Sequence, residues 1–139
     1  VGKVVGDLGL ERSFYKVAMR PGKPLMAGRL HGVAMAGLPG NPVSAMVCGQ
    51  IFIAPMIRAM LGLGANPLPT LTAPLSASLP ANGPRQHYMR AKLSQGRIQA
   101  YARQDSALLT VLSEANALLI RPPYDPARAI GEDVAYVQI

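Results

Sequence analysis

The stretch Leu38-Pro39-Gly40-Asn41-Pro42-Val43-Ser44-Ala45 decides how the first half of this chain folds, because it sets where the main helix begins. Asn is a favoured N-cap, since its side-chain oxygen accepts a hydrogen bond from an amide without a partner in the helix. Proline fits the first helical position, where its missing N–H costs no hydrogen bond. The pattern therefore predicts a helix from Asn41 to about residue 63, where glycines follow.

The interior of this predicted helix is almost entirely apolar. A helix that is hydrophobic on all sides must be covered on most of them, so we expect it to be buried against short strands in an α/β layer. Pro55 should kink or split it, because proline cannot donate the helical hydrogen bond. The uncharged window 43–57 is shorter than the roughly 20 residues that a membrane span needs, so the sequence predicts no membrane segment.

Shorter elements are predicted before this helix. The helical spacing of Val1, Val4, Val5 and Leu8 indicates a helix over residues 1–10 that ends near Gly9. We expect a strand over 14–19, a loop at 20–24, and two strands over 25–30 and 33–38. The last two are joined through His31-Gly32, a spacing typical of a hairpin.

The composition changes after the Gly/Pro-rich segment 64–69, which indicates a linker. We therefore divide the chain into residues 1–66, the end of an α/β unit, and residues 67–139, a β-rich unit. Alternation predicts strands over 71–77, 86–94, 98–103, 117–121 and 133–139, and we expect one or two helical turns over 107–114. Several short strands in about 70 residues favour a small, mostly antiparallel barrel or sandwich.

The overall composition excludes several classes of protein. Half of the 139 residues are hydrophobic and only 15% are charged, which is typical of a globular chain. The net charge of +7 is compatible with nucleic acid, but the basic residues are scattered singly and aromatics are only 5%, which argues against it. A single cysteine, Cys48, excludes an internal disulfide and favours a reducing, cytoplasmic setting. No signal peptide is visible, and the start at Val1 indicates a fragment of a longer polypeptide.

Two Pro-Gly loops carry the candidate site, and they lie in a stretch, residues 12–104, that has no Asp or Glu. The second loop, with Pro39 and Gly40, lets the backbone approach a ligand and leads into the helix start, whose amides suit an oxyanion. The first loop follows a strand with cations, so that Lys16 and Arg20 share one face of an extended chain ahead of Lys23. We expect both loops to converge on an anion, with these candidate residues: Lys16, Arg20, Lys23, Pro39, Gly40, Asn41, Pro42 and Ser44. A well-capped structural helix and a solvated basic face are the plainer alternatives.

Other polar residues allow two interpretations each. Arg90, in an alternating strand, is either an outward-facing residue or a planar fork for an oxyanion. Ser106 is either a helix cap or an oxyanion donor. His31 and His87 have no Cys or carboxylate at ligand spacing, so the sequence predicts no metal site and places both histidines in turns or on the surface.

Two blocks together resemble one family. Residues 14–24, Phe-Tyr-Lys-Val-Ala-Met-Arg-Pro-Gly-Lys-Pro, and residues 37–45, Gly-Leu-Pro-Gly-Asn-Pro-Val-Ser-Ala, are similar to blocks of the molybdopterin molybdenumtransferase family. Its members include bacterial MoeA and the E domain of gephyrin. The resemblance implies that residues 1–66 are the end of the molybdopterin-binding-like catalytic domain, followed by the C-terminal β domain.

The resemblance also implies an activity. Members of this family take adenylylated molybdopterin and molybdate, remove the adenylyl group with a divalent cation such as magnesium, and release molybdenum cofactor and AMP. They act as homodimers, with the cleft between subunits. Lys16 and Lys23 match family lysines that bind molybdate or the pterin phosphate, and Arg20 stands where the family usually has lysine. Pro39 and Pro42 match prolines that shape the cleft, and Arg90 and Ser106 match residues that complete the oxyanion site.

One expected feature is missing from this chain. The family's Gly/Ser-rich loop and the acidic residues that bind the cation have no counterpart in it, so the chain alone is predicted to be catalytically inactive and to bind no metal itself. Its catalytic residues cannot be assigned from the sequence. The alternative function is a non-catalytic dimerisation or docking module, the scaffold role that the corresponding domains of gephyrin have.

Overall fold

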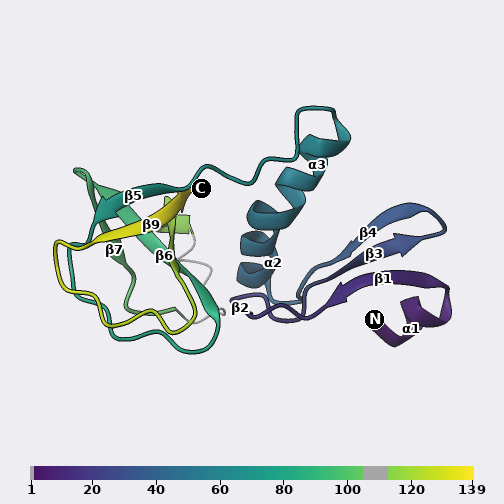
Figure 1. The fold of residues 1–139 in the computed structure, drawn as a ribbon, viewed down its shortest axis with the longest axis horizontal. Coiled ribbons are helices and arrows are strands. Elements are labelled where there is room, and N and C mark those ends of the chain that lie inside the picture. The colour runs from purple at the N-terminus through teal and green to yellow at the C-terminus, as the bar shows by residue number, and fades with distance from the viewer. Residues whose placement is uncertain (1, 105–112) are drawn as a thin grey trace.

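The computed structural model describes residues 2–104 and 113–139. Two groups of strands lie at opposite ends of the molecule, and a long helix stands between them (Figure 1). The first group is a three-stranded antiparallel sheet in the order β1-β3-β4. The second group is a sheet in the order β2-β6-β8-β9-β5, with β7 paired to β6.

The chain begins with helix α1, Gly2–Asp7, and Gly9 then takes a left-handed φ of 89°, as predicted for the helix end. Strand β1 covers Leu10–Tyr15 and strand β2 only Met19–Arg20. The prediction of one strand over residues 14–19 is therefore wrong. The break lies at Lys16, whose φ of 68° turns the chain out of the extended conformation.

The predicted hairpin is confirmed. Strands β3, Met26–Leu30, and β4, Val33–Gly37, pair antiparallel in register from Met26–Gly37 to Leu30–Val33. The two connecting residues, His31 and Gly32, have φ values of 49° and 80°. Two consecutive left-handed residues match the twist of the strands, which is the reason that a two-residue loop suffices here.

The main helix starts as predicted. Asn41 is extended, and its Oδ1 accepts a hydrogen bond from the Ser44 amide at 3.2 Å. The α-helix α2 covers Pro42–Cys48, a π-helical turn η1 covers Gly49–Ile53, and α3 covers Ala54–Met60. The predicted disruption near Pro55 takes the form of this widened turn, because the Ala54 amide bonds back to the Gly49 carbonyl and the helix continues.

The expected burial of the whole helix is wrong. Only its first part is covered: Val43, Val47 and Cys48 are buried, and Met60 remains 71% exposed. By length and composition, Pro42–Met60 could cross a membrane, and 22% of its apolar window is buried in this chain. One such helix is weak evidence of a span, because the core helices of soluble proteins have the same length and composition. That the chain has no membrane segment stays a prediction.

The second half is mostly antiparallel, as predicted. Its strands are β5, Leu71–Pro74; β6, Gln86–Ser94; β7, Arg97–Ala100; β8, Ala117–Arg121; and β9, Asp133–Gln138. The predicted bounds of β6 and β8 are met. Strands β5 and β9 end three residues and one residue earlier than predicted, and β7 begins one residue earlier and ends three residues earlier. An isolated bridge joins Leu75 to Ile98, but the paired strands described do not close into a barrel.

Two hydrophobic clusters form the core, and one joins both halves of the chain. The first lies inside the second sheet and includes Leu75, Ile98 and Leu119. The second contains Met19, Leu25, Val47 and Cys48 from the first half with Leu118 and Val137 from β8 and β9. The expected α/β layer is therefore only partly present, since the start of the helix packs on the second sheet.

Strand β2 also links the halves. It pairs parallel with β6 through Met19–Gln86 and Arg20–His87. This pairing brings the loop that follows Arg20 next to the second sheet. The domain boundary after residue 66 stays a prediction.

Candidate anion-binding site

A cavity of about 830 Å³ lies where the loop after β2, the first turn of α2 and the start of β6 meet. We call it the cationic cavity. Its lining comes from segments far apart in the sequence: Met19, Arg20, Pro21, Gly22, Lys23, Pro24, Ser44, Arg85, His87, Ala102 and Gln104. The two halves of the chain thus contribute opposite walls.

The first wall is fixed by the contact of Gly22 with the helix. Gly22 has a left-handed φ of 109°, and a Cβ at this position would lie 2.5 Å from the Cys48 Sγ. Only glycine fits both constraints, because other residues are strained at this φ and would clash. The loop is further closed by the Leu25 amide, which donates to the Gly22 carbonyl at 3.1 Å. Arg20 and Lys23, both exposed, are held at the cavity from this loop and the strand before it.

The second wall depends on Gln104. Its side-chain oxygen accepts from the Arg90 amide at 3.0 Å, and its Nε2 donates to the Arg90 carbonyl at 2.9 Å and to the Tyr101 carbonyl at 2.7 Å. Through these three hydrogen bonds, the Gln104 side chain pairs with the backbone of β6 much as a neighbouring strand would. They fix Gln104 at the cavity beside the strand that carries His87.

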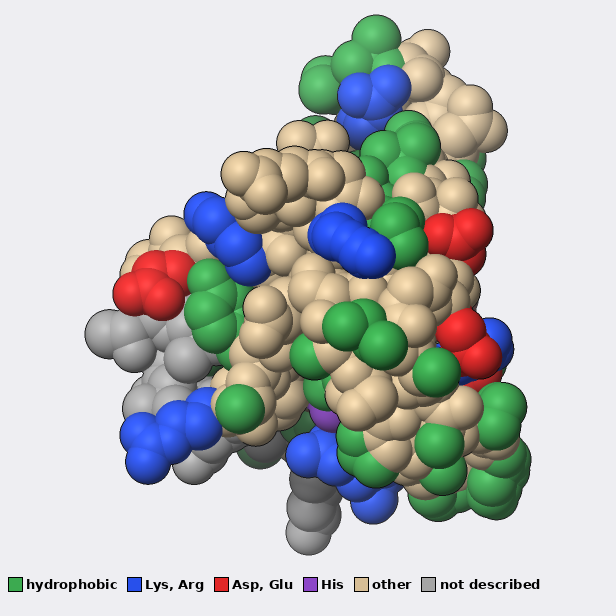
Figure 2. Space-filling view, turned by 90° about the vertical axis from the view of Figure 1, so that its left-hand side faces the viewer, with side chains coloured by type: hydrophobic (Ala, Val, Ile, Leu, Met, Phe, Trp, Pro, Cys, Tyr) green, Lys and Arg blue, Asp and Glu red, His purple; other side chains and the backbone are tan. Residues whose placement is uncertain are grey.

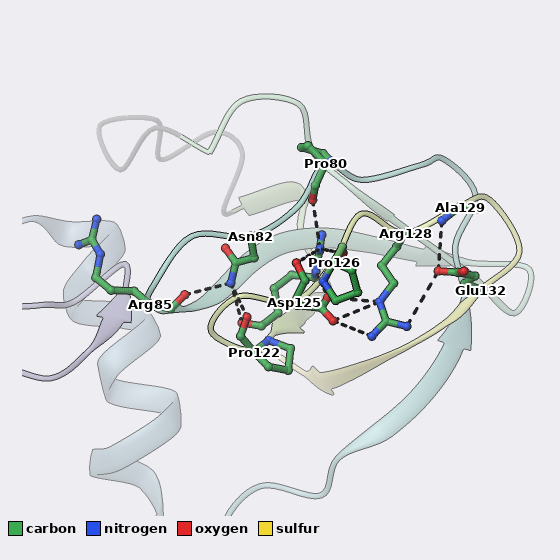
Figure 3. A network of polar contacts seen from close by, with 10 residues as sticks. Pro80, Asn82, Arg85, Pro122, Asp125, Pro126, Arg128, Ala129 and Glu132 are labelled. Atoms are coloured by element: carbon green, nitrogen blue, oxygen red, sulfur yellow. Dashed lines mark hydrogen bonds and ion pairs between the residues drawn. The ribbon is translucent and has the colours of Figure 1, made fainter.

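Arg85 enters this wall from a polar network behind it (Figure 3). The Asn82 Nδ2 donates to the carbonyls of Arg85, Arg121 and Pro122 at 3.0, 3.2 and 2.6 Å. Arg85 turns its carbonyl toward Asn82, and its guanidinium extends away from the network. The start of β6 is therefore anchored through its backbone, and the Arg85 side chain is left for the cavity.

The lining of the cationic cavity has one sign of charge. Arg20, Lys23 and Arg85 are cations, and none of the described lining residues is Asp or Glu. His87 is only 8% exposed, and burial first, then the charges of Arg20, Arg90, Arg121 and Arg85, lower its pKa from 6.5 to about 4. The imidazole is therefore neutral at pH 7. A cavity with fixed cations and no internal carboxylate favours a bound anion.

The arginines of the neighbouring network differ from those of the cavity, because a buried carboxylate neutralises them. Asp125 forms ion pairs with Arg121, which is 2% exposed, and with the Arg128 Nη2 at 2.6 Å. The hydrogen bond from Arg128, followed by the contributions of Arg121, holds the pKa of Asp125 below its usual value. Figure 2 views this end of the molecule, and its Lys and Arg side chains form separate groups without a continuous basic stripe.

The structure brings three of the predicted residues to one cavity: Arg20, Lys23 and Ser44. Lys16 is not among the described residues that line it. Because the chain turns at Lys16, its ammonium lies over the Tyr15 ring, 5.2 Å from the centroid. The prediction that Lys16 and Arg20 share one face of an extended strand is therefore wrong.

The second Pro-Gly loop faces a different space. Pro39 and Gly40 line a smaller cavity of about 230 Å³ together with Tyr15, Pro24 and Met26. Asn41 and Pro42 act at the helix start, where the Asn41 side chain is used as the cap. Pro24 borders both cavities, so the two loops are neighbours, but they do not surround one common space.

Arg90 is 1% exposed, so the interpretation as an outward strand residue is wrong. Arg90 is not among the described residues that line the cationic cavity. Its backbone nevertheless holds Gln104 at the cavity through hydrogen bonds, and its charge lowers the pKa of His87. The prediction for Ser106 falls outside the described residues. That these residues bind an oxyanion stays a prediction.

Sequence reasoning did not assign Arg85, His87 and Gln104 to the site. It placed His87 in a turn or on the surface, whereas the pairing of Arg20 with His87 buries it in the wall. The alternation of β6 could have indicated that His87 is buried. Residues 87, 89 and 91 lie on the same face of this strand, and Met89 and Ala91 pack in the first hydrophobic cluster.

The described residues provide no group of three or more His, Cys, Asp or Glu that could hold a metal ion. A magnesium ion needs oxygen ligands, commonly carboxylates, and the cationic lining does not suit it. Burial raises the pKa of the Cys48 thiol to about 11, so this cysteine acts as a small apolar side chain.

Comparisons with known proteins agree with this architecture. A family model described as MoeA C-terminal region (domain IV) matches residues 72–139. Molybdopterin molybdenumtransferase 2 of Mycobacterium tuberculosis is 41% identical over 119 residues, which cover 84% of this chain and 29% of that protein. The molybdopterin molybdenumtransferase of Synechococcus elongatus is 34% identical over 131 residues, 91% of this chain and 32% of that protein.

Solved structures have the same fold. A molybdopterin biosynthesis MoeA protein from Pyrococcus horikoshii superimposes with a TM-score of 0.83 at 23% identity, covering 99% of this chain and 34% of that one. A molybdenum cofactor biosynthesis protein from Pyrococcus furiosus gives a TM-score of 0.76 at 20% identity, over 94% of this chain and 46% of that one. The chain thus spans about a third of the length of the curated relatives that it matches.

Proposed function

Because the chain belongs to the MoeA family, whose C-terminal region it contains at residues 72–139, we propose that it forms part of a molybdopterin molybdenumtransferase. A role in molybdenum cofactor biosynthesis follows from the homology. The specific reaction that we propose for the whole protein is insertion of molybdate into adenylylated molybdopterin, with molybdenum cofactor and AMP as products. In this reaction the cationic cavity binds an oxyanion, either molybdate or the phosphate of the pterin.

The observation that carries this proposal is that none of the described residues lining the cationic cavity is Asp or Glu. Arg20 and Arg85 offer planar guanidinium forks that match two oxygens of a tetrahedral anion, and Lys23 offers a compact charge. The Ser44 hydroxyl and the Gln104 amide are neutral groups in the same lining. Because these groups come from opposite walls, an anion between them would offset their mutual repulsion and hold the walls together.

A divalent cation is the cofactor that the family implies, and the described residues do not fit one. We propose that the 139-residue chain binds the anion but does not release AMP by itself. The test is to incubate the chain with adenylylated molybdopterin, molybdate and magnesium. Release of AMP above that of a boiled control would contradict this part of the proposal.

Thermal unfolding in the presence of tungstate tests the anion site. A ligand that binds only the folded state raises the unfolding temperature as its concentration exceeds its Kd. We expect millimolar tungstate to raise the unfolding temperature by several degrees more than chloride at equal ionic strength. In Lys23→Ala, about ten times more tungstate should be needed for the same rise of the unfolding temperature, because one charge-assisted contact is lost.

Arg97→Ala is the matched control, since Arg97 is exposed at the start of β7 and does not line the cavity. It should keep the full response to tungstate. Equal responses to tungstate and chloride, or equal losses in Lys23→Ala and Arg97→Ala, would contradict an anion site at this position.

A dimerisation or docking module is the second candidate function. The observation in its favour is the uncovered apolar side of the main helix, where Met46, Ile57 and Met60 are 58%, 48% and 71% exposed. Monomeric soluble proteins rarely leave such a contiguous apolar surface uncovered. Sedimentation of the chain tests self-association: a dimer that dissociates in Ile57→Glu, but not in the exposed control Val33→Glu, would favour this role.

A further inference from the structure

We propose that His87 is a proton-binding member of the cationic cavity: it is neutral while the cavity is empty and takes one proton from solvent when a doubly charged oxyanion binds beside it. The inference rests on the proposed function, because it requires the cavity to bind an anion. It adds a regulatory property, namely that anion affinity rises as the pH falls. One N–H bond forms on the imidazole as one O–H bond of a hydronium ion from solvent breaks, and no other covalent bond changes.

The position of His87 supports this role. His87 is only 8% exposed, and it lines the cavity from the start of β6, two residues after Arg85. The backbone pairing of Arg20 with His87 sets the two side-chain positions directly opposite each other on β2 and β6. No hydrogen bond from a described residue holds the imidazole, whereas Gln86 beside it donates to the Tyr88 hydroxyl at 2.6 Å.

The charges around His87 come from every described element packed against it. Arg90 lies on β6, as His87 does, and Arg85 directly precedes this strand. Arg20 lies on β2, and Arg121 lies opposite His87 on β8. Of these, Arg121 is offset by Asp125. Lys23 lines the same cavity from the loop after β2. The described surroundings are therefore net positive. Burial first, and then the charges of the four arginines, lower the pKa of His87 to about 4.

A bound dianion reverses this balance. Its two charges offset Arg20 and Arg85 and attract the imidazolium directly. An opposite charge within about 4–6 Å raises the pKa of a histidine by about one to three units. At a pH between the pKa of His87 in the empty cavity and its pKa beside the bound anion, one proton is taken up with each anion. The affinity for the anion should therefore increase about tenfold for each unit that the pH falls within this range.

Proton NMR of the 139-residue chain tests the proposal directly, because the chain has only two histidines. Sulfate is a suitable probe, since it remains a dianion from about pH 4 to 8, where histidines titrate. We expect saturating sulfate to raise the midpoint of His87 by about one unit or more, compared with chloride at the same ionic strength. His31, in the exposed β3–β4 turn outside the cavity, is the internal reference.

Two variants complete the experiment. His31→Gln assigns the two resonances without touching the cavity. His87→Gln should remove the pH dependence of sulfate affinity, measured calorimetrically between about pH 4.5 and 6.5. Over the same range the affinity of the wild-type chain should rise on acidification, by about threefold for a one-unit shift of the His87 midpoint and by about twentyfold for a two-unit shift. If His87→Gln does not fold, the wild-type titration and His31→Gln still decide the question.

The outcomes separate the two proposals. Saturable sulfate binding without a shift of the His87 midpoint beyond that in chloride overturns this inference and leaves the anion site intact. Absence of any saturable binding of sulfate or tungstate overturns the proposed anion site, and this inference with it.

Discussion

The two groups of arginines at the second sheet contain the same side chains but have opposite electrostatics. In the first, Arg121 and Arg128 share the buried carboxylate of Asp125 (Figure 3). In the second, Arg20 and Arg85 face the cationic cavity, and no carboxylate of a described residue pairs with them. The comparison shows that a positive net charge says little by itself, because only charge that the fold leaves uncompensated is available to a ligand.

The difference has a structural cause. Asp125 lies four residues after Arg121 in a tight Pro-rich turn, so the first group is built within one short segment. The Arg121 guanidinium also donates to the carbonyls of Pro80 and Pro126 at 3.1 and 2.7 Å. The second group is assembled from β2, the loop after it and the residue before β6, and these segments contain no Asp or Glu. The following four predictions test the contrast between a structural and a ligand-binding group.

The largest effect is expected for Asp125→Asn. The change leaves the buried Arg121 guanidinium without its carboxylate, and breaking a buried ion pair on one side costs about 3–5 kcal/mol. Urea unfolding measures the loss. The control is Asp133→Asn, since Asp133 is exposed at the start of β9 and should change stability by less than about 0.5 kcal/mol. Equal stabilities of the two variants would mean that the network does not hold this part of the fold.

The second prediction concerns pH and separates the two groups. The pKa of His87 is about 4 in the folded chain against 6.5 in the unfolded one, so the unfolded state binds the proton first as the pH falls. Stability is therefore full above pH 6.5 and decreases by about 3 kcal/mol as the pH falls to 4. The lowered pKa of Asp125 affects stability at lower pH. The stabilisation that Asp125 contributes is fully present above its ordinary pKa of 3.8 and is lost as the pH falls below that value.

Urea unfolding at a series of pH values measures this decrease. His87→Gln should flatten the curve between pH 6.5 and 4 and leave the steeper loss below pH 4 in place. A wild-type curve that is flat in the upper window would refute the assignment of a buried neutral histidine.

Gly22→Ala tests how firmly the cavity wall is attached to the helix. A Cβ at this site meets the Cys48 Sγ, and the φ of 109° disfavours any L residue, so we expect a loss of about 2 kcal/mol. Gly83→Ala is the control, because nothing lies within 4 Å of its Cβ position and its φ is ordinary. Thermal unfolding of both variants gives the comparison. An unchanged unfolding temperature in Gly22→Ala would show that the wall moves freely.

The smallest effect is expected for Arg20→Gln. Arg20 is the first of the arginines whose charge lowers the pKa of His87, so its removal should raise that pKa from about 4 toward 6.5 while stability at pH 7 changes little. The same two-histidine NMR titration measures it. Arg29→Gln, on β3, is the control, since Arg29 neither lines the cavity nor appears among the charges that act on His87. A His87 midpoint that does not move would remove Arg20 from the electrostatics of the cavity.

Elements whose signal is local were predicted well. The N-cap at Asn41, the turn at His31-Gly32 and the bounds of β6 and β8 all depend on neighbours in the sequence. The break at Lys16 was missed because a left-handed φ at a lysine leaves no mark in a pattern of apolar residues. The burial of the main helix was overestimated, because an apolar composition indicates that a surface needs covering but does not say what covers it.

The candidate site was predicted only in part for the same reason. Arg20 and Lys23 were found because they lie three residues apart in one short segment, at the end of β2 and in the Pro-bounded loop after it. Arg85, His87 and Gln104 were missed because they reach the cavity through the pairing of β2 with β6 and through hydrogen bonds to Arg90. Lys16 was placed wrongly because its direction depends on one backbone angle.

The amino-acid sequence by itself determined the family, the start of the helix, the hairpin and the absence of acids between residues 12 and 104, since each is a property of adjacent residues or of composition. The tertiary structure alone decided which cations share a cavity, which arginines are neutralised by Asp125 and why His87 is uncharged at neutral pH. The physical reason is that electrostatic energy depends on distance and burial in space, and strand pairing between residues almost 70 positions apart sets both.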